Sequence, residues 1–73
     1  MQAATLEQAR AAKATLRAHL AGLPELRGIG VAFLPEGYGV KVLLERLPEA
    51  VAIPEEVDGV PVVIEIVDEF MLL

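Results

Sequence analysis

The sequence RGIGVAFLPEGYGVKVLLER, residues 27 to 46, decides how this chain folds. Its first half, residues 28–34, is apolar and uncharged, with bulky side chains at alternate positions, as in a buried strand: Ile29, Val31 and Phe33. The segment PEGYG at 35–39 holds two glycines and has the length of a hairpin loop of about five residues. The stretch therefore predicts a β-hairpin with strands at about 28–34 and 39–47, the first of which is buried.

A third strand is predicted at residues 60–68, VPVVIEIVD, by its β-branched content. Pro61 restricts this strand to a sheet edge or to its first pairing position. The first strand has no charge, whereas the second carries Lys41 and Glu45 and the third carries Glu65. Because a long uncharged edge strand promotes aggregation, we expect the first strand in the middle. The predicted order is 2-1-3 with the third strand parallel to the first; an antiparallel meander, 1-2-3, is the alternative.

An N-terminal helix is predicted at about residues 5–21. Thr5-Leu6-Glu7-Gln8 has the form of a capping box, in which Thr5 and Gln8 satisfy each other's backbone amides. Apolar residues then recur at three- and four-residue steps and form one narrow stripe: Leu6, Ala9, Ala12, Leu16, Leu20 and Leu23. Gly22 suits the left-handed residue after the last turn, and Pro24 prevents continuation.

The link between the second and third strands is long and contains two prolines. Pro54 followed by Glu55-Glu56-Val57 predicts one short helical turn, since proline and acidic residues favour the first positions of a helix. Asp58-Gly59 predicts a turn, and Val51 and Ile53 are expected to pack under one end of the sheet.

These elements predict a single α+β domain over residues 1–73, with flexible ends at 1–4 and 70–73. Its two layers are one N-terminal helix and a three-stranded mixed sheet. The helix should cover one face of the sheet: Ile29, Val31, Phe33, Val40, Val42, Leu44, Val62, Ile64 and Ile66. The other face and the C-terminal tail would then expose apolar side chains. We expect the following residues to form an interface: Leu34, Tyr38, Leu43, Leu47, Val63, Val67, Phe70 and Met71.

The composition favours a homo-oligomer, and a dimer in particular. Hydrophobic residues make up 55% of the chain, above the usual share of about 45 to 50%, so we expect a partner chain to cover some of them. Cysteine is absent, which excludes disulfides and thiolate metal sites. A net charge of -5 disfavours nucleic acid as a ligand. The absence of serine, asparagine, cysteine and tryptophan fits a thermophilic source or a GC-rich genome.

Charge is distributed unevenly along the chain. Residues 1–23 carry three basic side chains against Glu7, while residues 24–73 are strongly acidic, so helix and sheet are electrostatically complementary within one molecule or between two. No segment resembles a signal peptide or a membrane span. A cytoplasmic protein that does not bind membranes is therefore expected.

No pattern in the sequence predicts a catalytic, cofactor-binding or metal site. His19 is the only histidine, and there is no serine or cysteine that it could activate as a nucleophile. Glu55, Glu56 and Asp58 match no calcium loop and are interpreted as a solvated acidic turn. The glycine pairs at 28–30 and 37–39 have the wrong spacing and placement for a phosphate loop.

Two functions follow from this interpretation. The first is a non-enzymatic interaction module that self-associates through the open sheet face. The alternative is a small-ligand or effector-binding regulatory domain, with a site between helix and hairpin lined by His19, Arg17 or Tyr38.

Three segments carry a family resemblance: LPELRGIGVAF at 23–33, GYGVKVLLE at 37–45 and IPEEVDGVPVVIEIV at 53–67. Together they resemble small bacterial modules found alone or ahead of trypsin-like serine peptidase domains, over about residues 13–68. Residues 53–62 are the most specific part of the resemblance, whereas residues 23–28 depart from the Pro-Gly-Val that is usual in these modules. The resemblance implies a stand-alone accessory module without catalytic residues, because the peptidase chemistry belongs to the absent domain.

Overall fold

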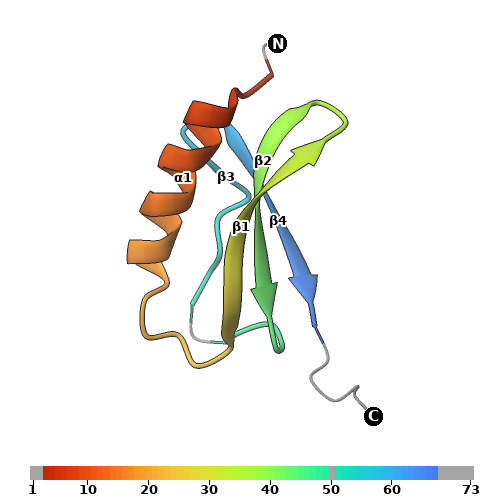
Figure 1. The fold of residues 1–73 in the computed structure, drawn as a ribbon. Helices are drawn as coiled ribbons and strands as arrows, with labels where there is room; N and C mark the ends of the chain where they lie inside the picture. The colour runs from red at the N-terminus through yellow and green to blue at the C-terminus, as the bar shows by residue number, and fades with distance from the viewer. Residues whose placement is uncertain (1–2, 50, 68–73) are drawn as a thin grey trace.

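The computed structural model describes residues 3–49 and 51–67 as one helix on a four-stranded mixed sheet. Along the chain the elements are α1 (Leu6–His19), β1 (Leu26–Leu34), β2 (Gly37–Leu44), β3 (Glu56–Val57) and β4 (Val60–Ile66). Figure 1 shows α1 on one side of the twisted sheet, with the segment between β2 and β4 returning along the molecule to β3. The α+β class predicted from the sequence is therefore confirmed.

The capping box forms at the start of α1. The Gln8 amide donates to Thr5 Oγ1 (3.1 Å), and the Thr5 amide donates to Gln8 Oε1 (2.8 Å). Gly22 has a φ of +85°, the left-handed conformation expected just after a helix. The helix buries Ala9, Ala12 and Leu16 against the sheet, and its alanines allow a close approach.

The hairpin turn is tighter than the predicted loop of about five residues. Leu34 pairs with Gly37, so that only Pro35 and Glu36 lie between the strands. Proline is favoured at the second position of such a turn and glycine at the fourth, where Gly37 has a φ of +132°. The N-terminal segment lies against this turn, because the Tyr38 amide donates to the Ala4 carbonyl (3.1 Å).

The strand order is β1-β2-β4-β3, so the predicted order 2-1-3 is wrong. β2 lies between an antiparallel β1 and a parallel β4, which also differs from the antiparallel meander. Val40, Val42 and Leu44 of β2 are fully buried. The charges of β2 and β4 do not exclude them from the middle of the sheet, because Lys41 and Glu65 lie on the uncovered face and pair there (3.0 Å).

A fourth strand, β3, occupies the segment predicted as a helical turn. Glu56 pairs with Pro61 and Val57 with Val60, in a hairpin antiparallel to β4. Asp58 (φ +50°) and Gly59 (φ +82°) form its two-residue turn, and positive φ at both central positions is typical of a type I′ turn. Tight pairing across Asp58-Gly59 therefore takes precedence over the helical preference of Pro54-Glu55.

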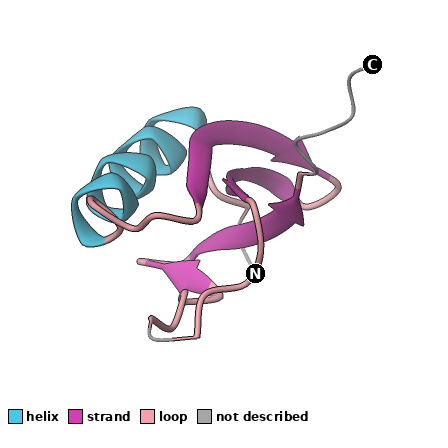
Figure 2. Cartoon of the chain, turned by 90° about the horizontal axis from the view of Figure 1, so that it is seen from below, coloured by secondary structure: helices cyan, strands magenta, loops and turns pink. Residues whose placement is uncertain are grey.

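The core lies between α1 and the sheet, and the link after β2 extends it. Val51, Ile53 and Val57 pack against the buried cluster beside the helix, and Figure 2 shows α1 to one side of the curved strands. The core consists of Ala9, Ala12, Leu16, Leu20, Val40, Val42, Leu44 and Val60. Among residues 3–49 and 51–67, no helix combines the length and apolarity needed to cross a membrane.

Three residues predicted to lie under the helix are exposed instead. Phe33 is 77% exposed, Ile66 50% and Ile64 37%. Helix α1 contacts mainly β1 and β2, and the helix together with segment 51–57 leaves the turn end of β1 and the C-terminal half of β4 uncovered. The alternation that assigns a residue to a sheet face is correct here, but one short helix does not cover the whole face.

Candidate interaction surface

The sheet face opposite α1 has no covering layer within the described part of the chain. We call it the open face. Alternation and strand register assign it these residues: Gly28, Gly30, Ala32 and Leu34 of β1, Gly39, Lys41 and Leu43 of β2, and Pro61, Val63 and Glu65 of β4. Two of these ten residues are charged and three are glycines, so the side chains on this surface are mostly apolar.

Both leucines of the open face lie against a glycine of the neighbouring strand. A Cβ added at Gly39 would come within 2.6 Å of Leu34 Cδ1, so Leu34 needs the glycine there, whereas one added at Gly28 would be 3.6 Å from Leu43 Cδ1, an ordinary contact distance. Each leucine therefore lies across a glycine of the neighbouring strand and is half-buried although no layer covers it. The open face is consequently flatter than its leucine content would suggest.

The charges on the open face neutralise one another. Lys41 Nζ and Glu65 Oε1 are 3.0 Å apart, on neighbouring parallel strands. Both side chains are partly exposed, so the pair contributes little to folding stability. Its main effect is that the face presents no net charge to an apolar partner.

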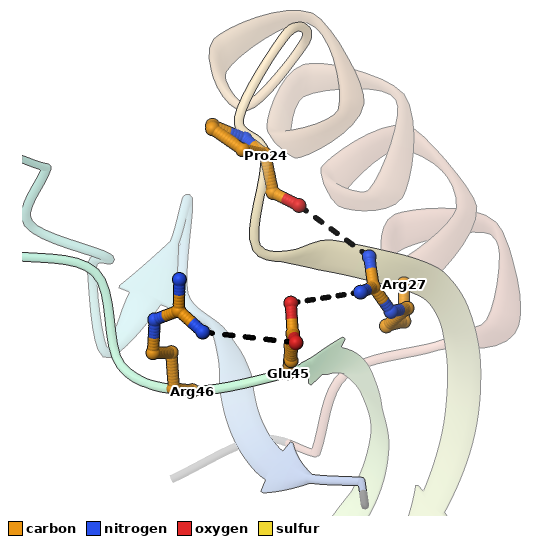
Figure 3. Close-up of polar contacts among 4 residues, drawn as sticks. All are labelled: Pro24, Arg27, Glu45 and Arg46. Carbon is orange, nitrogen blue, oxygen red and sulfur yellow. Dashed lines mark hydrogen bonds and ion pairs between the residues drawn. The ribbon is translucent and has the colours of Figure 1, made fainter. Parts of the chain in front are cut away.

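A second charge cluster closes the end of the sheet where β1 begins. Figure 3 shows Glu45, just after β2, between two arginines: Arg27 Nη2 at 2.8 Å and Arg46 Nη1 at 3.6 Å. Arg27 also donates to the Pro24 carbonyl (3.4 Å). The register of β1 against β2 shifts between Leu26 and Gly28, so Arg27 occupies a bulge. The cluster thus holds the irregular start of β1 against the end of β2.

The residues predicted to form an interface occupy different surroundings. Leu34, Leu43 and Val63 lie half-buried on the open face. Val67 follows β4 and is also half-buried, its amide donating to the Leu44 carbonyl (2.9 Å), and Leu47 is 62% exposed beyond the end of β2.

Three further predicted interface residues lie elsewhere. Tyr38 packs toward the core, and its ring meets that of Phe33 edge-on, with centroids 5.0 Å apart. Phe70 and Met71 lie outside the described residues.

The structure does not bring His19, Arg17 and Tyr38 together. His19 borders an open hollow of about 360 Å³ between the end of α1 and the segment around Pro48 and Val51. Tyr38 borders another, of about 560 Å³, between the hairpin turn and the β3–β4 turn, and Arg17 lines neither of the two. No group of three or more potential metal ligands gathers among residues 3–49 and 51–67.

The basic side chains of α1 do not pair with the acidic sheet within the described structure. The ion pairs between described residues join Arg27, Lys41 and Arg46 to Glu45 and Glu65. Arg10, Lys13 and Arg17 take part in none of them. The charge complementarity seen in the sequence is therefore not used inside this part of the molecule, and a basic surface remains on the helix.

No protein-family model matches this chain, and neither curated proteins nor solved structures give a significant match. The resemblance to the peptidase-associated modules therefore stays a prediction.

Proposed function

We propose that this protein is a non-enzymatic interaction module that self-associates through the open face of its sheet, most simply as a dimer. The observation that supports this most directly is the flat surface made by Leu34, Leu43 and Val63, over which residues 3–49 and 51–67 place neither a second layer nor a net charge. A two-layer fold of this kind exposes apolar area that a second subunit can bury.

Sheet-on-sheet packing suits this surface. Two such faces pack about 10 Å apart with their strands within roughly 30° of each other. Leucines that already lie across glycines need little rearrangement, because few rotamers are lost on contact. The Lys41–Glu65 pair can be buried as a unit, whereas either charge alone would oppose association.

The size of the open face predicts weak association. Three strands spaced about 4.8 Å apart, each contributing about seven residues of roughly 3.3 Å, give a footprint of roughly 300 to 350 Å² per subunit. Stable complexes bury about 800 Å² per partner, so dissociation constants in the micromolar range or weaker are expected. Self-association should therefore depend visibly on protein concentration.

Sedimentation equilibrium or light scattering over a concentration series tests the proposal. The mass should rise from that of the 7.8 kDa chain toward twice that value, and Leu43→Lys should keep it at the monomer value at every concentration. Ala14→Lys, on the exposed side of α1, is the matched control and should behave as the wild type. A folded wild-type chain that remains monomeric at millimolar concentration would overturn the proposal.

A further inference from the structure

The outer edge of β1 is an unprotected strand edge. β1 is the terminal strand of the sheet and its longest, with nine residues. Beyond strand pairing, none of the backbone hydrogen bonds between described residues involves 28–34, so the amides and carbonyls that point away from β2 find no partner there. Residues 28–34 carry no charge and no proline, the features that usually prevent pairing at an edge.

The basic side of α1 lies next to this edge. The core-facing residues Ala9 and Leu16 fix the orientation of the helix. At 100° per residue, Arg10 and Lys13 fall on one flank and His19 on the other. His19 borders the segment around Pro48 and Val51, which leads to β3 and β4. The opposite flank, with Arg10 and Lys13, therefore faces the β1 side of the molecule.

We propose that the outer edge of β1 binds an extended acidic segment of a partner protein, which adds to the sheet as a further strand. Its backbone would pair with residues 28–34, and its acidic side chains would lie on the helix side, beside Arg10 and Lys13. Strand addition of this kind takes affinity from main-chain hydrogen bonds and specificity from alternate side chains. This inference is independent of the open face and of self-association.

The spacing of the cations indicates the sequence pattern of the partner. Arg10 and Lys13 lie about 4.5 Å apart along the helix axis at a rise of 1.5 Å per residue. Alternate residues of a strand are about 6.7 Å apart, so two acids at positions i and i+2 match the two cations once the Arg10 side chain reaches outward. The intervening residues would lie on the open-face side, where a Cβ added at Gly30 meets nothing within 4 Å and leaves room for bulk.

Charge argues against a second copy of this chain as the occupant of the edge. Pairing β1 with its own copy about a two-fold axis would place the two sheets in one plane with both helices on the same face. With strands about 4.8 Å apart and α1 above β1 and β2, the helix axes would lie roughly 10 Å apart. The two basic flanks would then face each other with two cations each, whereas an acidic strand would neutralise them.

Binding of a defined peptide tests the proposal. The probe is a blocked nine-residue peptide alternating valine and glutamate, titrated into the wild-type chain and followed by NMR and amide hydrogen exchange. We expect saturable binding, slower exchange of the outward amides within 28–34, and weakening as salt rises from 50 to 500 mM. The same peptide with lysine in place of glutamate should not bind.

Charge-reversal variants test whether the peptide binds beside the β1 edge or elsewhere on the surface. Arg10→Glu should raise the dissociation constant about tenfold, because a favourable pair becomes a repulsive one. Arg46→Glu is the matched control: it makes the same charge change on an exposed arginine beyond β2 and should leave binding within about twofold. Circular dichroism establishes that both variants are folded.

Three results would overturn the inference. The first is no binding of the acidic peptide at millimolar concentration by a folded wild-type chain. The second is protection at Val63 and Glu65 in place of 28–34, which would move the site to the open face. The third is protection of 28–34 that rises with protein concentration in the absence of peptide, which would identify a second copy as the occupant. Loss of self-association in the Leu43→Lys variant affects none of these readouts.

Discussion

The two edges of the sheet, β1 and β3, are protected to very different degrees. β3 has two residues, begins with Glu56 shortly after Pro54, and ends in a tight Asp58-Gly59 turn. β1 has nine residues, and from Gly28 to Leu34 none is charged. Short length, charge and proline are the means by which proteins prevent strands from pairing at an edge, and this chain applies them all at β3. Among the described residues, β1 therefore lacks the features that protect the opposite edge of the sheet.

The largest loss of folding stability is expected from a substitution in β2, which lies between the two edge strands. Val42→Ala in β2 should lower the free energy of unfolding by about 2 kcal/mol, because the side chain is fully buried. Phe33→Ala in β1 removes a larger side chain but should cost no more than about 1 kcal/mol, since Phe33 is 77% exposed and loses mainly its ring contact with Tyr38.

Urea unfolding followed by circular dichroism at a fixed protein concentration measures both variants. A large loss of stability from Phe33→Ala would mean that the β1 edge is covered in the folded protein.

An intermediate effect is expected at the turn that closes the β3 edge. Gly59→Val places a β-branched residue at a φ of +82° and should cost about 1 to 2 kcal/mol through the backbone alone, because a Cβ there meets nothing within 4 Å. Gly30→Ala is the control: the space at its Cβ is equally empty, but its φ is not in the left-handed range, so its effect should stay within about 0.5 kcal/mol.

Amide exchange at Val57 and Val60 should accelerate in Gly59→Val and stay unchanged in Gly30→Ala. Equal effects of the two substitutions would contradict the type I′ turn.

The smallest effect is expected from the ion pair on the open face. Glu65→Gln should change the free energy of unfolding by less than about 0.5 kcal/mol, because both Lys41 and Glu65 are partly exposed. Thermal unfolding of the variant and the wild type in the same buffer measures this difference. A loss well above 1 kcal/mol would show that the charges hold β4 against β2.

Local signals in the sequence predicted the local structure well. Thr5 and Gln8 form the expected capping box, Gly22 takes the left-handed conformation after the helix, and residues 60–66 form the expected strand. Each of these features depends on residues close together in the chain, where hydrogen bonding and dihedral preference decide the outcome.

The strand order could not be predicted in the same way, because it depends on contacts between distant residues. The distribution of charge predicts that the uncharged first strand lies in the middle of the sheet, yet β1 lies at one edge. Lys41 and Glu65 lie on inner strands, but on the uncovered face of the sheet. The alternation of side chains along a strand allows this placement in both the predicted and the observed strand order. β3 was missed because Glu56 and Val57 form a strand only through the Asp58-Gly59 turn.

The candidate surfaces were partly predictable. Alternation places Leu43 and Val63 on the open face, and β4 retains this phase along its length. The exposure of Phe33 and the position of Arg10 on the flank of α1 beside β1 follow from the tertiary arrangement, which sets where the helix ends and which flank it presents.

The leucine–glycine contacts on the open face imply a constraint on sequence change. Any side chain at position 39 would meet Leu34 Cδ1 and the Pro61 carbonyl, at 2.6 and 2.9 Å from its Cβ, and would lift the leucine away from the sheet. Position 39 must then remain glycine in proteins that keep this sheet, because a smaller residue at 34 would relieve the contact with Leu34 but not the one with the Pro61 carbonyl. The flat surface at Leu34 thus depends on the absence of a Cβ at Gly39.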